Sequence, residues 1–310
     1  MVAGRDVAAP IVAITLGDPR GIGPEIVAKA LRDERVRALP VRWRIVGPSG
    51  VEVAPDDVIG AWHPSGDKVS DAAQAGRLAG LAVERAATMA LQGTVSAIVT
   101  APLDKAALHA GGYDYPGHTE MLAALAGVPT TMMLASERLR VVLATTHIPL
   151  RDVHAALTHE LIVRTAEITR EGLRRGFGIA EPRLALCALN PHVGDGGRFG
   201  DEDELLLAPA ARAAGIAGPF PADTVFVRAM RGEFDAVIAP YHDVGMTAIK
   251  VASFGSAVNV TLGLPFPRTS PDHGTALDIA GQGMASAESM IAAMTLAVAL
   301  TTPMLDSLSL

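Results

Sequence analysis

Short apolar runs that end abruptly in polar turns recur along the chain. Helix-length patterns lie between several of them, for example Ala72–Gln92 and His159–Gly176. Continuous apolar runs alternating with helices predict an α/β fold with a largely parallel sheet, because the strands of such a sheet are covered on both faces. Ligands of these sheets bind at the carboxyl ends of the strands, so the polar turns mark the predicted site. Five runs show the pattern: Ile11–Leu16, Val95–Thr100, Leu139–Thr146, Leu184–Leu189 and Phe234–Ala239.

Length and composition extend this picture to two lobes. The chain has 310 residues, of which 49% are hydrophobic, 4% aromatic and 19% charged, so small aliphatic side chains fill its core. A single core stops growing at about 250–300 residues. We therefore expect two lobes with a cleft between them, where small-molecule sites tend to lie.

Charge, cysteine content and hydropathy narrow the class of partner. With 26 basic and 33 acidic residues, the net charge of −7 argues against nucleic-acid binding and for a small-molecule partner. Cys187 has no second cysteine with which to form a disulfide, and its apolar surroundings predict an inert core thiol in a reducing, cytoplasmic compartment. The apolar stretch Met290–Leu300 is too short for a membrane helix and predicts a buried or interfacial one. Val7–Leu16 is interpreted as the first strand rather than a signal peptide.

Three histidines share one context, since each follows the end of an apolar run. His147, His192 and His242 are separated by 45 and 50 residues, which suits one helix and its connections per gap. Three imidazoles that leave one position open are typical of a catalytic metal site for zinc or another divalent ion. Each histidine alone is more often a surface or hydrogen-bonded residue. Asp243 is equally open as an orienting partner of His242, a proton acceptor or a turn residue.

The glycines of GDPRGIGPE, residues 17–25, have the wrong spacing for a GxGxxG dinucleotide fingerprint, and no P-loop motif is present. Pro24 suits the first turn of a helix that runs through Ala30. A glycine loop before a helix can accept an anion. It can equally be a tight turn, and Glu25 would repel an anion, so both interpretations stay open.

A second group of polar residues resembles an anion clamp. Asn259 interrupts the apolar run Ala257–Leu262, where a buried amide needs a hydrogen-bond partner. Arg268 lies in a proline-stiffened loop, and Lys250 lies eight residues beyond the third histidine. Each of the three is by itself more often a solvated or structural group.

In the GHTE segment, His118 and Thr119 precede the predicted helix Met121–Ala126. Thr119 either caps that helix or faces a substrate together with His118.

Taken together, the motifs resemble the 4-hydroxythreonine-4-phosphate dehydrogenase family of pyridoxal 5'-phosphate synthesis. They run nearly end to end, and jointly they are specific although each alone is weak. The motifs are GDPRGIGPEI, TAPLDK, YPGHTEML, TTHIPL, LNPHVGDGGRFGDED, PADTVF, YHDVG and AVNVTLGLPFPRTSPDHGTALDIAGQG.

The resemblance implies a fold and a set of roles. The fold would be the one of isocitrate and isopropylmalate dehydrogenases, with two α/β/α lobes and a cleft, which holds NAD without the usual fingerprint. The lobes are expected at 1–125 with 280–310, and at 126–279, the second carrying most metal and substrate residues. Family members are homodimers with the site at the interface, so the third histidine is expected from the neighbouring chain. The implied metal ligands are His147, His192 and His242, and the implied substrate ligands are His118, Thr119, Lys250, Asn259 and Arg268.

The implied reaction is oxidation of 4-hydroxythreonine 4-phosphate by NAD or NADP with the help of a Zn, Mg or Co ion. Decarboxylation then yields 3-amino-2-oxopropyl phosphate. Asp243 and Asp223 are candidate bases, and each is also interpretable as an orienting or turn carboxylate.

Departures from the family pattern leave the substrate open. Val244 replaces the glutamine of YHDQG, Arg20 replaces a frequent alanine, and the chain is shorter between Gly47 and Ser70. As an oxidoreductase, the protein could instead act on another phosphorylated hydroxy acid, such as 4-phospho-erythronate or 4-phospho-threonate, or on an aromatic dihydrodiol. Two further alternatives are a metallohydrolase with three histidine ligands and a non-catalytic binding protein. The anion clamp favours a phosphorylated substrate.

Overall fold

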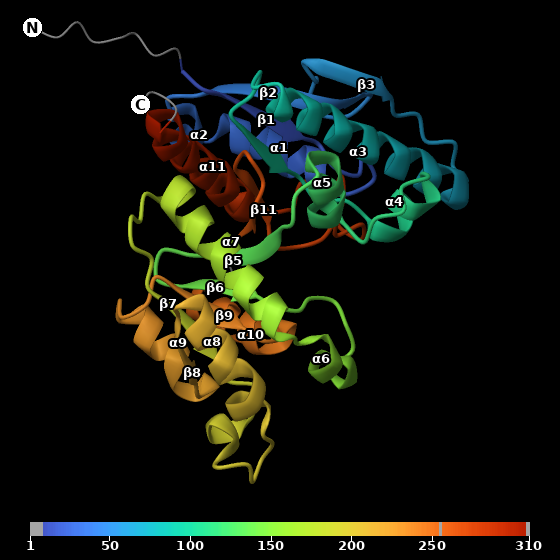
Figure 1. Ribbon diagram of the computed structural model, residues 1–310. Helices are drawn as coiled ribbons and strands as arrows, with labels where there is room; N and C mark the ends of the chain where they lie inside the picture. Colours follow the sequence, from blue (N-terminus) through green and yellow to red (C-terminus); the bar gives the residue numbers. More distant parts are fainter. Residues whose placement is uncertain (1–8, 254–255, 308–310) are drawn as a thin grey trace, which may run out of the picture. The chain divides into compact units, whose positions relative to one another are not determined.

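The computed structural model describes residues 9–253 and 256–307 and divides into two compact units (Figure 1). Among these residues, unit 1 comprises the chain up to Gly127 together with Pro265–Leu305, and unit 2 comprises Val128–Leu264 together with residues 306–307. The chain returns to unit 1 earlier than the expected residue 280, because the strand that begins at Arg268 pairs with a strand of unit 1. Arg268, expected in the second lobe, therefore belongs to unit 1.

A fully parallel sheet forms the centre of unit 1, in the order β3-β2-β1-β4-β11. Every residue of β4 and all but the first of β1 are buried, as continuous apolar runs predict. The predicted first strand is β1; residues 7 and 8 of that prediction lie outside the described residues. The strands are β1 (Ile11–Thr15), β2 (Arg42–Ser49), β3 (Asp57–Ala61), β4 (Ala97–Thr100) and β11 (Arg268–Pro271).

Helices pack against this sheet with local sequence signals at their ends. The N-cap of α3 is Asp67, whose carboxylate accepts the Ser70 amide at 2.9 Å, and α3 then packs against β1–β4. Met290 and Met294 of α11 are fully buried, which confirms the predicted buried helix. The helices of unit 1 are α1 (Gly23–Arg32), α2 (Glu34–Arg37), α3 (Lys68–Leu91), α4 (Lys105–Ala110), α5 (His118–Ala126) and α11 (Glu288–Ser307).

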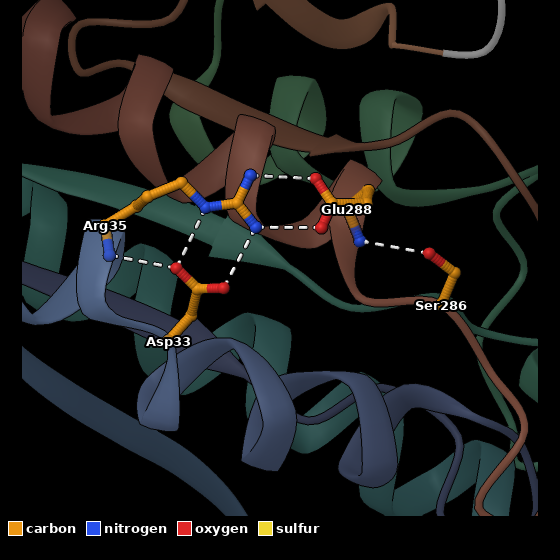
Figure 2. Close-up of polar contacts among 4 residues, drawn as sticks. All are labelled: Asp33, Arg35, Ser286 and Glu288. Atoms are coloured by element: carbon orange, nitrogen blue, oxygen red, sulfur yellow. Dashed lines mark hydrogen bonds and ion pairs between the residues drawn. The ribbon is translucent and has the colours of Figure 1, made fainter.

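The start of α11 is joined to the start of α2 by one arginine (Figure 2). The Arg35 guanidinium donates to Asp33, the N-cap of α2, at 2.9 Å and to both oxygens of Glu288 at 2.8 and 2.9 Å. Hydrogen bonds from the side chain and the backbone amide of Arg35 lower the pKa of Asp33 to about 2, because they favour its charged form. Two segments far apart in the sequence are thereby fixed to each other within unit 1.

Unit 2 contains a mixed sheet in the order β10-β5-β6-β9-β7-β8. The run β6-β9-β7-β8 is parallel, as predicted, whereas β5 pairs antiparallel with β6 and β10. The antiparallel pairing follows from the short turn between β5 and β6, closed by a hydrogen bond from Ser136 N to Leu139 O at 2.9 Å, since only antiparallel strands can be joined so tightly. The strands are β5 (Thr131–Ala135), β6 (Arg140–Leu143), β7 (Leu184–Cys187), β8 (Ala217–Phe220), β9 (Ala236–Ala239) and β10 (Val258–Leu262).

An apolar cluster contributed by the β6, β7 and β9 strands and the helices α9 and α10 forms part of the core of unit 2. Burial raises the pKa of the Cys187 thiol in this cluster to about 12, which confirms an inert core thiol. The helices of unit 2 are α6 (Leu150–Ala156), α7 (His159–Phe177), the 3₁₀ turn η1 (Pro191–Gly194), the π-helical η2 (Asp203–Leu207), α8 (Ala208–Ala214), α9 (Ala222–Met230) and α10 (His242–Ser253). Across the described part of the chain, no helix combines the length and apolar character needed to span a membrane.

Candidate functional site

The topology of unit 2 brings the three histidine turns to one edge of its sheet. Strands β6, β9 and β7 are parallel neighbours, so their carboxyl ends lie at the same edge. His147 follows β6, His242 begins α10 directly after β9, and His192 lies in η1 after β7. The strand-end argument from sequence therefore holds for the backbone of all three.

His147 and His242 also meet through their side chains. Their ring centroids are 5.6 Å apart with an interplanar angle of 44°. Two hydrogen bonds hold the loops that carry them together: Ala144 N donates to Ala239 O at 2.9 Å, and Thr145 Oγ1 donates to Pro240 O at 2.8 Å. Hydrogen bonds between the two loops, and not the imidazoles alone, thus fix the pair.

A cavity of about 220 Å³ opens beside this pair. The Asp243 carboxylate lies 2.7 Å from Nδ1 of His242, and because a carboxylate only accepts, Nδ1 is the protonated nitrogen. This leaves the Nε2 lone pair of His242 available, which is the arrangement found in metal-binding histidines. The cavity is lined by Thr145, Thr146, His147, Ile148, Leu150, Val153, Tyr241, His242 and Asp243.

His192 is not part of this pair within the chain. It is exposed and lies 6.4 Å, centroid to centroid, from the ring of Phe199. Among the residues that the structure describes, no three His, Cys, Asp or Glu side chains are grouped closely enough to hold a metal ion. The structure therefore brings together two of the three predicted ligands, and a ligand from a neighbouring chain stays a prediction.

The backbone at two of the three histidines is in the left-handed region. His147 has a φ of 50° and His192 a φ of 54°. Non-glycine residues adopt this conformation at a cost, and they do so mainly where surrounding contacts enforce it, often at functional sites. The strain thus supports the choice of these turns, although it identifies no ligand.

The remaining predicted residues of unit 2 lie on three elements. Lys250 is exposed on α10, two helical turns beyond His242, and Asp223 is exposed in the first turn of α9. Asn259 lies in β10, and its Oδ1 atom is buried with no hydrogen-bond partner among the described residues. We expected Asn259 to need a hydrogen-bond partner, and no described protein group provides one for Oδ1. A bound ligand is therefore still a candidate partner.

Arg268 is the centre of a second polar group, in unit 1. Its side chain is 1% exposed, and Nη2 donates to Oγ1 of Thr100, the last residue of β4, at 2.6 Å. Burial lowers the pKa of Arg268 to about 10, against the opposing charge of Glu120. A cation so removed from water is well suited to bind a phosphate or carboxylate.

His118, the first residue of α5, belongs to the same polar group. Its Nε2 atom is buried and has no hydrogen-bond partner among the described residues. Burial lowers the pKa of His118 well below 6.5, and the charges of Arg268 and Lys105 lower it further, so the imidazole is neutral. The N-cap of α5 is Gly117, so the alternative that Thr119 caps this helix is wrong.

Lys105 is not among the site residues predicted from the sequence. It is exposed at the first position of α4, and its charge acts on His118. The signal was available in TAPLDK, because this turn follows one of the five apolar runs and carries a cation.

The structure favours the tight-turn interpretation of GDPRGIGPE. A Cβ atom on Gly17 would lie 2.1 Å from Pro102 O, and one on Gly23 would lie 2.4 Å from Leu16 O, so neighbouring backbone occupies this space. Glu25 is buried and accepts hydrogen bonds from Lys29 at 2.7 Å and from the Ala285 amide at 3.0 Å. Packing therefore accounts for these glycines without an anion.

The departure at Val244 also has a structural explanation. Val244 is half-buried against the apolar cluster that includes Val141 and Ile249. An apolar residue at this position extends the core of unit 2.

Comparison with known proteins extends these observations. The family model described as pyridoxal phosphate biosynthetic protein PdxA matches residues 46–297. The chain is 44% identical to a 4-hydroxythreonine-4-phosphate dehydrogenase of Geobacter metallireducens, over 93% of this chain and 94% of the relative. It is 42% identical to a D-threonate 4-phosphate dehydrogenase of Cupriavidus necator, over 92% and 95%.

Solved structures agree with the expected fold. The crystal structure of 4-hydroxythreonine-4-phosphate dehydrogenase from Klebsiella pneumoniae is similar to this chain with a TM-score of 0.81 and 38% identity, covering 96% of this chain and 99% of that one. A beta-decarboxylating dehydrogenase from Thermococcus kodakarensis shares the fold at 16% identity and a TM-score of 0.50, covering 93% and 83%. The predicted isocitrate/isopropylmalate dehydrogenase type of α/β fold is confirmed.

Proposed function

Because the chain belongs to the PdxA family of pyridoxal phosphate biosynthetic proteins, we propose that it oxidises 4-hydroxythreonine 4-phosphate, with decarboxylation to 3-amino-2-oxopropyl phosphate. Its relatives are dehydrogenases, so the chain is an oxidoreductase of this family. The hydride acceptor that we propose is NAD or NADP, and the pathway is pyridoxal 5'-phosphate synthesis in the cytoplasm.

The observation that carries this proposal is the polar group of unit 1. Arg268 is almost wholly removed from water, and an anion that balances its charge would offset the cost of that burial. A substrate phosphate provides such an anion, with two or three oxygens for the guanidinium fork. His118 lies beside it as a neutral hydrogen-bonding group, and we propose Thr119 as a further substrate contact.

The second part of the site is in unit 2. We propose that Lys250 and Asn259 bind the substrate, and the buried Asn259 Oδ1 without a described partner supports this role. An amide oxygen accepts hydrogen bonds, so Asn259 suits the amino or hydroxyl group of the substrate better than its phosphate.

The residues of unit 2 also fit a divalent metal. His147 and His242 present two imidazoles to one cavity, and the bond from His242 Nδ1 to Asp243 leaves Nε2 as a ligand. We propose these two histidines and His192 as the ligands, and imidazole donors favour Zn or Co over Mg. When bound, the ion would lower the pKa of the substrate hydroxyl and stabilise negative charge on its oxygen.

We propose different roles for the two candidate carboxylates, Asp243 and Asp223. Asp243 holds the tautomer and orientation of His242, which supports an orienting role rather than that of a free base. Asp223 is exposed and remains our candidate to accept the hydroxyl proton as hydride leaves the substrate carbon. The loop GDPRGIGPE does not fit a nicotinamide dinucleotide, since backbone occupies the space beside its glycines. We therefore assign the cofactor no contact there.

A relative named D-threonate 4-phosphate dehydrogenase supports a second candidate substrate. 4-Phospho-threonate and 4-phospho-erythronate share the phosphate, the hydroxyl and the carboxylate of the first candidate. Only the amino group distinguishes 4-hydroxythreonine 4-phosphate, so the two functions differ in one contact.

A substrate screen tests the proposal directly. Purified protein is mixed with each phosphorylated hydroxy acid, NAD or NADP, and Zn, Co or Mg ions, and absorbance of the reduced nicotinamide is followed. We expect reduction with 4-hydroxythreonine 4-phosphate and loss of activity in a chelator. Hydrolysis that persists without a nucleotide would favour the metallohydrolase, and ligand-induced stabilisation without turnover would favour a binding protein.

A further inference from the structure

The turn that carries His192 has an unusual backbone. His192, Val193 and Asp195 are all in the left-handed region, with φ values of 54°, 59° and 46°. Three such residues within four positions, none of them glycine, are unstable unless surrounding contacts hold them in place. The structure therefore needs an anchor for this turn.

Asp203 provides the first part of an anchor. Its side chain is fully buried, and its two carboxylate oxygens accept the backbone amides of Leu189 and Asn190, each at 2.8 Å. Leu189 and Asn190 lie between the end of β7 and the start of the strained turn. Both bonds reach back more than ten residues, so Asp203 fixes a different element rather than capping its own helix.

Glu202 provides the second part. Its Oε2 atom accepts the side-chain amide of Asn190 at 2.7 Å. Gly200 lies against this bond, since a Cβ atom there would be 2.4 Å from Glu202 Oε2 and 2.7 Å from Asn190 Nδ2. Two neighbouring carboxylates thus hold the backbone and the side chain of Asn190, two residues before His192.

The element that carries these carboxylates is itself irregular. Asp203 begins η2, a π-helical turn that continues into α8. π-Helical turns are rare and occur frequently at functional sites. This turn directs a buried carboxylate towards the loop after β7.

We propose that Asp203 is a positioning residue that holds the turn after β7 so that His192 is presented to the metal, with Glu202 and Asn190 as a supporting contact. The inference rests on the proposed function, in which His192 is a metal ligand. It goes beyond that function by assigning a role to a buried carboxylate that touches neither metal nor substrate.

The test is a Co²⁺ titration of the full-length protein followed by visible absorption, which reports both affinity and ligand geometry. Asp203→Asn keeps the size of the side chain but replaces one acceptor oxygen with a donor, so one backbone amide loses its partner. We expect Co²⁺ affinity to fall at least about ten-fold and the absorption band to change, as is typical when an outer contact of a metal ligand is removed.

Asp235→Asn is the matched control. Asp235 also accepts a backbone amide at 2.8 Å, that of Arg183, but at the opposite end of β7. We expect this variant to lose a comparable amount of stability and to keep wild-type Co²⁺ affinity. Equal affinities in the two variants would overturn the inference.

His192→Ala separates the inference from the proposed function. If it leaves Co²⁺ affinity unchanged, the metal role of His192 fails, and the inference as stated fails with it. Tryptic cleavage after the exposed Arg198 then shows whether Asp203 holds the turn: faster cleavage in Asp203→Asn alone would leave a purely structural anchor. If His192→Ala weakens binding but Asp203→Asn does not, only the positioning role is wrong. If Asp203→Asn does not fold, Asn190→Ala replaces it, with a smaller expected loss of affinity.

Discussion

At the scale of single residues, burial decides the chemistry of the polar group in unit 1. Arg268 and His118 have ordinary side chains whose pKa values are both lowered by removal from water. The two respond differently, because the guanidinium keeps its charge at neutral pH whereas the imidazole loses it. The result is one fixed cation beside one neutral hydrogen-bonding group.

Replacing Arg268 with alanine should weaken substrate binding. Charge-assisted hydrogen bonds are worth about 1.5–3 kcal/mol, so KM for the phosphorylated substrate should rise about ten- to hundred-fold. KM for the nicotinamide cofactor should change little. Steady-state kinetics with each reactant varied in turn measures both, and the exposed Arg37→Ala is the control. An unchanged substrate KM would contradict the anion clamp.

His118 should make the protein less stable in acid. Its folded pKa lies below the ordinary value of 6.5, so below pH 6.5 the unfolded chain takes up a proton that the folded protein does not. Stability from this residue is thus retained above pH 6.5 and lost as pH falls, approaching about 1.4 kcal/mol per pH unit. Urea unfolding at pH 7.5 and 5.5 should show a smaller loss in His118→Gln than in the wild type. Equal losses would mean that His118 titrates normally.

At the scale of elements, close approach of helices depends on particular glycines. The helices α3 and α4 touch at Gly76, where a Cβ atom would lie 1.7 Å from the carbonyl oxygen of Ala107. Since α4 carries Lys105 at its first position, this contact also sets where that cation lies. Packing of two helices is here coupled to the charge near His118.

Gly76→Ala should destabilise unit 1 by about 1–3 kcal/mol, the usual cost of overpacking, because the obstructing atoms are backbone and cannot rotate away. Denaturant unfolding measures the change. Gly274→Ala is the control, since no atom lies within 4 Å of its added Cβ. Similar midpoints for the two variants would argue against a tight α3–α4 contact.

The ion pair between Arg35 and Glu288 (Figure 2) should contribute less to stability than the contact between α3 and α4. Arg35 and Glu288 have side chains that are 55% and 70% exposed, so water and salt screen their attraction. Glu288→Gln should lower Tm slightly at low ionic strength and not at all in molar salt. A large decrease in Tm that does not depend on salt would indicate that this contact stabilises the protein by more than an exposed ion pair does.

At the scale of the whole molecule, the proposed metal site would need ligands from two chains. His147 and His242 meet within the chain and His192 does not join them, which is the pattern expected if the ligands come from two subunits. We therefore expect a homodimer in which each site takes two histidines from one chain and one from its partner.

Mixing inactive variants tests this arrangement. His192→Ala and His242→Ala homodimers should both be inactive. After subunit exchange, half of the dimers are mixed and one of the two sites in each is complete, so about a quarter of wild-type activity should return. Co-refolding followed by the nicotinamide assay measures it. No recovery, with exchange verified by mass spectrometry, would place all ligands in one chain.

The sequence by itself determined the local elements and the places where chemistry was to be sought. Apolar runs and the turns after them predicted β1, β4, β6, β7 and β9, because strands buried on both faces must be apolar throughout. Family motifs singled out the candidate site residues, and their strand-end positions explained why distant histidines emerge at one edge of the sheet.

Only the tertiary structure decided which of these residues meet and in what state. Pairing of β11 with β4 assigned Arg268 to unit 1, and that pairing has no signal in local sequence. The neutral state of His118 and the hydrogen bonds of Asp203 to the backbone amides of Leu189 and Asn190 arise from contacts between separate elements. Such contacts depend on burial and distance in the folded chain, so a one-dimensional pattern does not determine them.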